Sequence, residues 1–199
     1  TYKNPHIYVM DRDGGNVRMI SGDFDRSPNG LTWAADGSGL YFNVSELGTR
    51  NVYFVDRDGG VSQITRGNHL LSFSSMTEDG FMVGTRTNYH EPGDVVSFRA
   101  SAGVENESGL TELTHVNDDV LAGVTLGEVE EVWYKSVDDY DIQGWIIKPP
   151  DFDPNQQYPM MLAIHGGPHG MYNVGFNFGW QEHAANGYVV LYTNPRGSS

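Results

Sequence analysis

The sequence has no cysteine, few positive charges and no long hydrophobic run, and each absence excludes a class of protein. Without cysteine there is no disulfide scaffold, no thiolate metal site and no cysteine nucleophile. Twelve Lys and Arg face 26 Asp and Glu, a formal net charge of -14, so we expect no nucleic-acid partner. The longest apolar runs, 160–164 and 188–192, are far shorter than the roughly 20 residues of a membrane span, so we expect no membrane association.

The N-terminus gives little information on localisation. Thr1 is not an initiator Met, and no apolar signal-peptide core follows it, which favours a start further upstream. A cysteine-free chain tolerates either redox environment. The compartment therefore stays unknown; we expect a soluble protein, with the cytoplasm favoured over the periplasm.

The first part of the chain contains a repeat of short strands. Residues 7–15 match residues 52–60 at an offset of 45, and residues 31–37 align with 75–80 on a shared Asp-Gly at an offset of 43. Four short strands per period of about 40 to 45 residues are typical of a four-stranded antiparallel β-propeller blade. The strands of one blade are predicted at Gly30–Trp33, Leu40–Val44, Asn51–Asp56 and Val61–Thr65.

These blades do not make a complete propeller. About 120 residues form somewhat under three blades, whereas a closed ring needs roughly four to eight. The ring is completed either by blades before Thr1 or by separate chains, and the start in mid-blade favours the first.

Two acidic turns could suggest calcium-binding loops, but the spacing of their residues does not support this. Asp13-Gly14 and Asp58-Gly59 stand where a tight hairpin needs positive φ. A calcium loop would need a ligand where the next glycine stands, and a Glu at its twelfth position. We therefore expect hairpin turns and no metal site, including at Asp11 and Asp56.

The pattern changes near residue 126. An acidic joint at 127–131 is followed by strand patterns, then a buried run typical of a parallel sheet covered on both faces, a helix, and another buried strand. The strands are predicted at 132–134, 142–148, 158–164 and 188–193, and the helix at 178–185. We therefore predict two incomplete domains: propeller blades over 1–126 and, over 127–199, the N-terminal part of an α/β-hydrolase domain.

The motif that carries chemistry is His165-Gly166-Gly167-Pro168, between a predicted buried strand and a helix. In α/β-hydrolases a loop at this place donates a backbone N–H to the oxyanion. Two adjacent glycines let the main chain approach a substrate carbonyl, because no Cβ blocks it. The alternative is a plain strand-to-helix turn.

Together these features resemble the prolyl oligopeptidase family of serine peptidases, over the whole chain. The matching parts are the blade repeats and residues 127–130, 144–149, 165–168 and 194–198. The chain looks most like the acylaminoacyl-peptidase branch, a resemblance that assigns the oxyanion donor to the backbone N–H of Gly167. Other branches use a tyrosine hydroxyl, and their paired-glutamate amine anchor is not evident here.

The nucleophile elbow Gly-x-Ser-x-Gly is absent. Ser38, Ser108 and Ser198 each lie beside a glycine, but none has two glycines at the spacing that the elbow requires, two positions before and two positions after the serine. In this fold the serine, acid and histidine all follow the oxyanion loop, so the chain is expected to be inactive alone. The resemblance assigns no catalytic role to His165, His169 or His183. The four-residue spacing of His165 and His169 would suit two zinc ligands on one helix, but Gly-Gly-Pro between them prevents a helix there.

The expected function is therefore that of a fragment of a serine peptidase, which hydrolyses short peptides through an acyl-enzyme without a cofactor. Its expected partners are a short peptide and the remaining blades and hydrolase part of the same protein; a homo-oligomer stays open. The alternatives are a non-catalytic scaffold or peptide-binding module, and an esterase on the same fold. Arg196 is expected to brace its turn, to form an ion pair between domains, or to be solvated.

Overall fold

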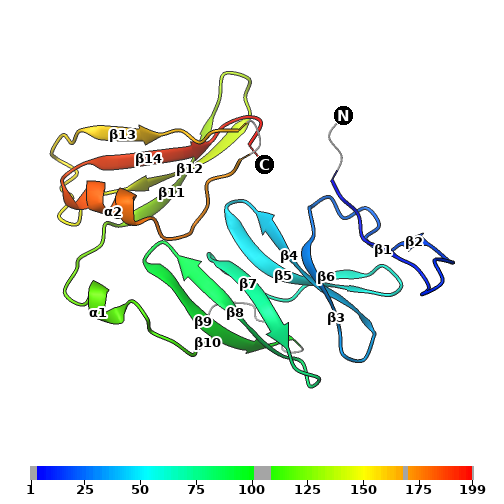
Figure 1. Cartoon of the computed structure of the whole chain (residues 1–199). Coiled ribbons are helices and arrows are strands. Elements are labelled where there is room, and N and C mark those ends of the chain that lie inside the picture. Colours follow the sequence, from blue (N-terminus) through cyan, green and yellow to red (C-terminus); the bar gives the residue numbers. More distant parts are fainter. Residues whose placement is uncertain (1–3, 101–108, 168–169, 199) are drawn as a thin grey trace. The chain divides into compact units, whose positions relative to one another are not determined.

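The computed structural model of the chain describes residues 4–100, 109–167 and 170–198. It divides into two compact units, which we describe separately (Figure 1). Unit 1 comprises residues 1–87 and 93–115, and unit 2 comprises 88–92 and 116–199. In the described ranges no helix is long and apolar enough to cross a membrane.

The first unit consists of β-strands. They are β1 (Tyr8–Val9), β2 (Arg18–Met19), β3 (Asn29–Trp33), β4 (Gly39–Glu46), β5 (Thr49–Asp56), β6 (Val61–Gln63), β7 (Leu70–Met76), β8 (Phe81–Asn88), β9 (Glu91–Arg99) and β10 (Thr111–Glu112). Strands β3 to β6 form an antiparallel meander, and β7 to β10 follow one another in the same order. Only the Arg50–Leu70 pair joins β5 to β7, in parallel.

The four strands predicted for one blade are confirmed as β3 to β6, with ends shifted by no more than two residues. The β-rich class of unit 1 is therefore as expected. Its assignment to a propeller, and the expected boundary after residue 126, remain predictions.

Strand β5 lies between two hydrophobic clusters because its side chains alternate between the faces of the sheet. Val55 packs with Ile7, Phe42 and other apolar residues of one cluster, whereas Val52 packs with Leu71 and its neighbours in the other. Both valines are fully buried. Each such side chain contributes roughly 1.5–3 kcal/mol of stability.

The two acidic turns have the same structure, as their repeat predicts. In both, a backbone hydrogen bond of 2.9 to 3.0 Å closes the turn between its first and fifth residues, over 11–15 and 56–60. Gly14 and Gly59 have φ of 86° and 100°. The expected hairpin turns with glycine at positive φ are confirmed.

In the second turn the Asp56 carboxylate accepts hydrogen bonds from the backbone of the turn itself. Its Oδ1 accepts hydrogen bonds from the N–H groups of Asp58 at 2.8 Å and Gly60 at 2.9 Å. Both bonds lower the pKa of Asp56 below its ordinary value, and the bond from Gly60 has the larger effect. Asp56 therefore acts as a turn acceptor.

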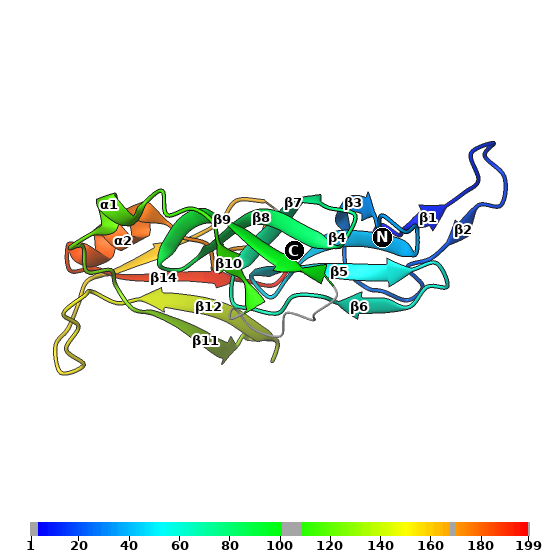
Figure 2. The same ribbon diagram turned by 90° about the horizontal axis from the view of Figure 1, so that it is seen from below.

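The second unit contains a mixed sheet and two helices. Its elements are α1 (Asp118–Leu121), β11 (Val129–Lys135), β12 (Asp141–Ile147), β13 (Met160–Ala163), α2 (Phe178–Ala185) and β14 (Val189–Asn194). The sheet order is β11-β12-β14-β13, and β13 and β14 are parallel. Figure 2 shows α2 alongside β14. The predicted βαβ unit and its helix are thus confirmed.

One expectation about this sheet was wrong. The run 158–164 does form a strand, but β13 is not covered on both faces: Met160, Leu162 and Ile164 are 61%, 53% and 78% exposed. These alternate side chains point to the same face of the sheet, and α2 packs mainly against β14 and β12 and leaves β13 uncovered. Strand β14 is enclosed instead, with Val190 and Tyr192 each 1% exposed.

Candidate functional site

The candidate site lies where two parallel strands end. The loop that begins at residue 164 follows β13, and the turn 195–198 follows β14. Because β13 and β14 are parallel neighbours, their carboxyl ends meet at one edge of the sheet. In open α/β sheets this edge is where ligands bind.

His165 joins these two segments. Its Nε2 lies 2.8 Å from the Oγ of Ser198, and its Nδ1 lies 2.9 Å from the carbonyl oxygen of Gly166. A carbonyl oxygen only accepts, so Nδ1 carries a proton; in the neutral imidazole Nε2 then accepts from the Ser198 hydroxyl. The imidazole therefore fixes its own loop to the turn after β14.

The two glycines of the motif are exposed, whereas Gly170, a few residues further on, is closely packed. Gly166 and Gly167 are exposed, and a Cβ on Gly166 would meet nothing within 4 Å. A Cβ on Gly170, in contrast, would lie 3.0 Å from the carbonyl oxygen of Gly166. The exposed side leaves room for a ligand at the backbone of the two glycines. Pro168 and His169 lie outside the described residues.

A second link holds the segment after the glycines. The N–H of Tyr172 donates to Asn194 Oδ1 at 2.7 Å, and Asn194 Nδ2 donates to the carbonyl oxygen of Tyr172 at 3.0 Å. The ring of Tyr172 also meets the His165 imidazole edge-on at 5.1 Å. Asn194 ends β14, so the loop is anchored at two places, to this strand at Asn194 and to the turn after it at Ser198.

An aromatic core lies beneath these links. The rings of Trp180 and Tyr192 stack at 4.2 Å, and Trp145 stacks on Tyr192 at 5.2 Å. Burial raises the pKa of the Tyr192 phenol far above its ordinary value, and raises that of Tyr172 to a smaller extent. Both phenols therefore stay neutral at physiological pH.

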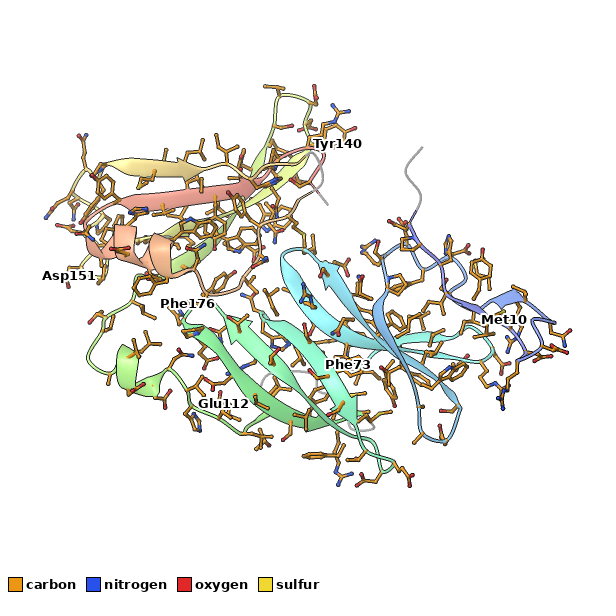
Figure 3. The ribbon with its side chains drawn as sticks, in the orientation of Figure 1. Met10, Phe73, Glu112, Tyr140, Asp151 and Phe176 are labelled. Atoms are coloured by element: carbon orange, nitrogen blue, oxygen red, sulfur yellow. The ribbon has the colours of Figure 1, made fainter. Side chains whose placement is uncertain are left out.

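Arg196 braces the turn after β14. Its Nη1 donates to Asp138 Oδ2 at 2.7 Å, and its guanidinium carbon lies 4.8 Å from the centre of the Tyr140 ring, in the turn before β12 (Figure 3). Both partners belong to unit 2. Of the roles weighed from the sequence, the bracing role fits these contacts.

The remaining sequence candidates lie apart from this loop or outside the description. His183 lies on α2 and faces Tyr188. The Ser38 N–H donates to Asp36 in a turn of unit 1, and Ser108 is outside the described residues. Within the described part of the chain, no group of three or more His, Asp or Glu could hold a metal ion. The Ser198–His165 contact is the feature that sequence reasoning missed.

Comparison with known proteins places these features in context. No family model matches the chain. It is 31% identical over 167 residues to the uncharacterized peptidase YuxL of Bacillus subtilis, covering 83% of this chain and 24% of the relative. It is 28% identical over 194 residues to dipeptidyl-peptidase 5 of Porphyromonas gingivalis, covering 96% of this chain and 28% of the relative.

A solved structure agrees with these matches. The acylaminoacyl peptidase of Pyrococcus horikoshii superimposes with a TM-score of 0.79 at 28% identity, over 99% of this chain and 29% of the other. The chain thus spans about a quarter of the length of the proteins it matches. The relatives are peptidases, and these matches agree with the resemblance of the chain to a part of the prolyl oligopeptidase family, which the motifs at 127–130, 144–149, 165–168 and 194–198 carry.

Proposed function

We propose that the chain is part of a serine peptidase that hydrolyses short peptides, and that it supplies the oxyanion loop of the active site. The observation that carries this proposal is the exposed Gly166-Gly167 backbone, held at the sheet edge by the contact between His165 and Ser198. The peptidase names of its relatives support it.

In this mechanism the Gly167 N–H stabilises developing charge. A serine that follows residue 199 in the complete protein attacks the peptide carbonyl carbon, and the electron pair of the C=O bond moves to oxygen. The N–H of Gly167 donates a hydrogen bond to that oxyanion. The histidine of the triad, which like the serine would follow residue 199, takes the hydroxyl proton during the attack and gives it to the leaving amine. Collapse re-forms the C=O bond, breaks the C–N bond and leaves an acyl-enzyme, which water hydrolyses. The loss of one such donor typically costs about a hundred- to thousandfold in rate.

The segment before residue 127 would control access. Residues 1–126 would be the last blades of a propeller that screens out folded proteins, and residues 127–199 the start of the hydrolase domain. A similar acylaminoacyl peptidase structure, with a TM-score of 0.80 and 27% identity, is a complex with Z-Gly-Gly-Phe-chloromethyl ketone. That complex supports a peptide as the substrate class here.

Within the family we place the chain in the acylaminoacyl-peptidase branch, because the resemblance assigns the oxyanion donor to the Gly-Gly backbone and both Gly166 and Gly167 are exposed. The second candidate is release of dipeptides, which the match to dipeptidyl-peptidase 5 favours. The two differ in the amino end they accept: acylated for the first, free for the second.

Labelling with a fluorophosphonate tests the proposal. We expect the complete protein to be labelled at one serine beyond residue 199, and the 199-residue chain to be neither labelled nor active on an acyl-peptide. A complete protein that folds and takes no label would instead favour the non-catalytic scaffold. A label inside residues 1–199 would contradict the expected position of the nucleophile.

A further inference from the structure

Arg50 in unit 1 has an unusual set of partners. It lies on β5, opposite Ser45 of β4, and its backbone pairs with Leu70 of β7. Its Nε donates to Ser45 Oγ at 3.2 Å, and its Nη1 donates to Ser72 Oγ at 2.9 Å. The arginine is half-buried, so its charge is partly withdrawn from water.

Four other arginines, unlike Arg50, form ion pairs with carboxylates within the part of the chain that the structure describes. These pairs are Arg26–Glu46, Arg86–Glu112, Arg99–Asp79 and Arg196–Asp138. In the described ranges no carboxylate forms an ion pair with Arg50. In a chain with 26 acidic residues and a net charge of -14, a half-buried arginine held only by hydroxyls is an exception.

Arg50, Ser45 and Ser72 together still have hydrogen atoms to donate, but few free acceptor atoms. Each serine oxygen already accepts from the guanidinium, so each hydroxyl hydrogen remains to be donated. The second terminal nitrogen of Arg50, Nη2, has no partner among the described residues. Donors on two hydroxyls and a guanidinium suit an anion, and a guanidinium matches a planar carboxylate.

We propose that Arg50, Ser45 and Ser72 form a binding site for a single carboxylate group, such as that of a peptide or another organic acid. One positive charge balances one negative charge, as in the four arginine–carboxylate pairs of the same chain. Phosphate sites usually collect more positive charge or several backbone N–H groups. The ligand would thus take the place that Glu or Asp takes beside the other arginines.

An NMR titration of the chain at pH 7 tests this site without any enzymatic activity, so its failure would not bear on the proposed peptidase. The signal is the Nε–H of Arg50, and the probes are acetylglycine, its carboxamide and inorganic phosphate. We expect a saturable shift with acetylglycine, with Kd on the order of 1–10 mM, and none with the carboxamide. This comparison uses the wild-type chain and needs no variant.

Variants then assign the site. Arg50→Gln, and separately the double change Ser45→Ala with Ser72→Ala, should weaken acetylglycine binding by about tenfold or more, read from backbone amides of β4 and β5. Arg57→Gln, which removes an exposed arginine of the same unit, is the matched control and should leave binding unchanged. The proposal is overturned if the carboxamide shifts the signal as acetylglycine does, if phosphate alone saturates it, or if Arg57→Gln weakens binding equally.

Discussion

His165 and Ser198 are hydrogen-bonded through Nε2 and Oγ at 2.8 Å, although 33 residues separate them in sequence. The contact joins the loop after β13 to the turn after β14. Since the Nδ1 of the same imidazole meets the Gly166 carbonyl oxygen, one side chain ties the glycine loop to a second strand end. Arg196, two residues before Ser198, connects the turn after β14 to Asp138 through an ion pair.

Ser198→Ala in the complete protein should therefore lower kcat by about two- to tenfold and leave KM little changed. The change removes the hydroxyl that fixes His165, and a hydrogen bond of this kind is worth about 0.5–1.5 kcal/mol. Steady-state kinetics on an acyl-peptide measure the effect. Ser198→Thr keeps a hydroxyl and is the control: it should retain most of the activity. Equal kcat in the alanine variant and the wild type would show that this contact does not position the loop.

The two turn glycines should differ in their sensitivity to alanine. Gly14→Ala and Gly59→Ala both force a side chain to positive φ, which costs about 1 kcal/mol or more. At Gly59 the new Cβ would also lie 3.2 Å from the carbonyl oxygen of Ile20, whereas at Gly14 it meets nothing within 4 Å. Urea unfolding of the chain should show the larger loss for Gly59→Ala. A stability loss in neither variant would contradict the turn assignment.

The same turns should not respond to calcium. The Asp56 carboxylate is engaged with the backbone of its own turn, so we expect an unchanged Tm when calcium replaces a chelator in the buffer. A rise of several degrees would mean that these loops bind the ion.

The turn at Asp56 should also make stability depend on pH in acid. Its folded-state pKa is depressed, so the carboxylate favours the folded chain above its unfolded pKa of about 3.9, and this contribution is lost as pH falls through the lower folded pKa. The difference in unfolding free energy between wild type and Asp56→Asn should therefore shrink between pH 6 and pH 2. A difference that stays constant over that range would show that the ionised carboxylate has no special role in the turn.

Local features of this fold follow from the sequence, whereas contacts between distant segments do not. The strand ends of β3 to β6 and the turns at Gly14 and Gly59 depend on alternation and on backbone freedom, which neighbouring residues determine. The exposure of β13 depends on what lies beside it, and an apolar run alone does not specify its neighbours.

The candidate site shows the same division. The motif 165–168 predicts a loop after a strand, and the structure places its described residues there. The pairing of His165 with Ser198 depends on β13 and β14 being parallel neighbours, which is a property of the sheet register. The partner of Arg196 likewise comes from the β11–β12 turn, 58 residues earlier.

The central claim is that the Gly167 N–H holds the oxyanion, and Gly167→Pro in the complete protein tests it most directly because proline has no N–H. Folding is checked first by the melting temperature and by Arg50 and backbone NMR signals, so that a damaged turn is not mistaken for a catalytic defect. We predict that a folded variant has a kcat on an acyl-peptide at least about a hundredfold below that of the wild type. A folded Gly167→Pro protein with near-normal kcat would show that another group, such as a tyrosine hydroxyl, holds the oxyanion.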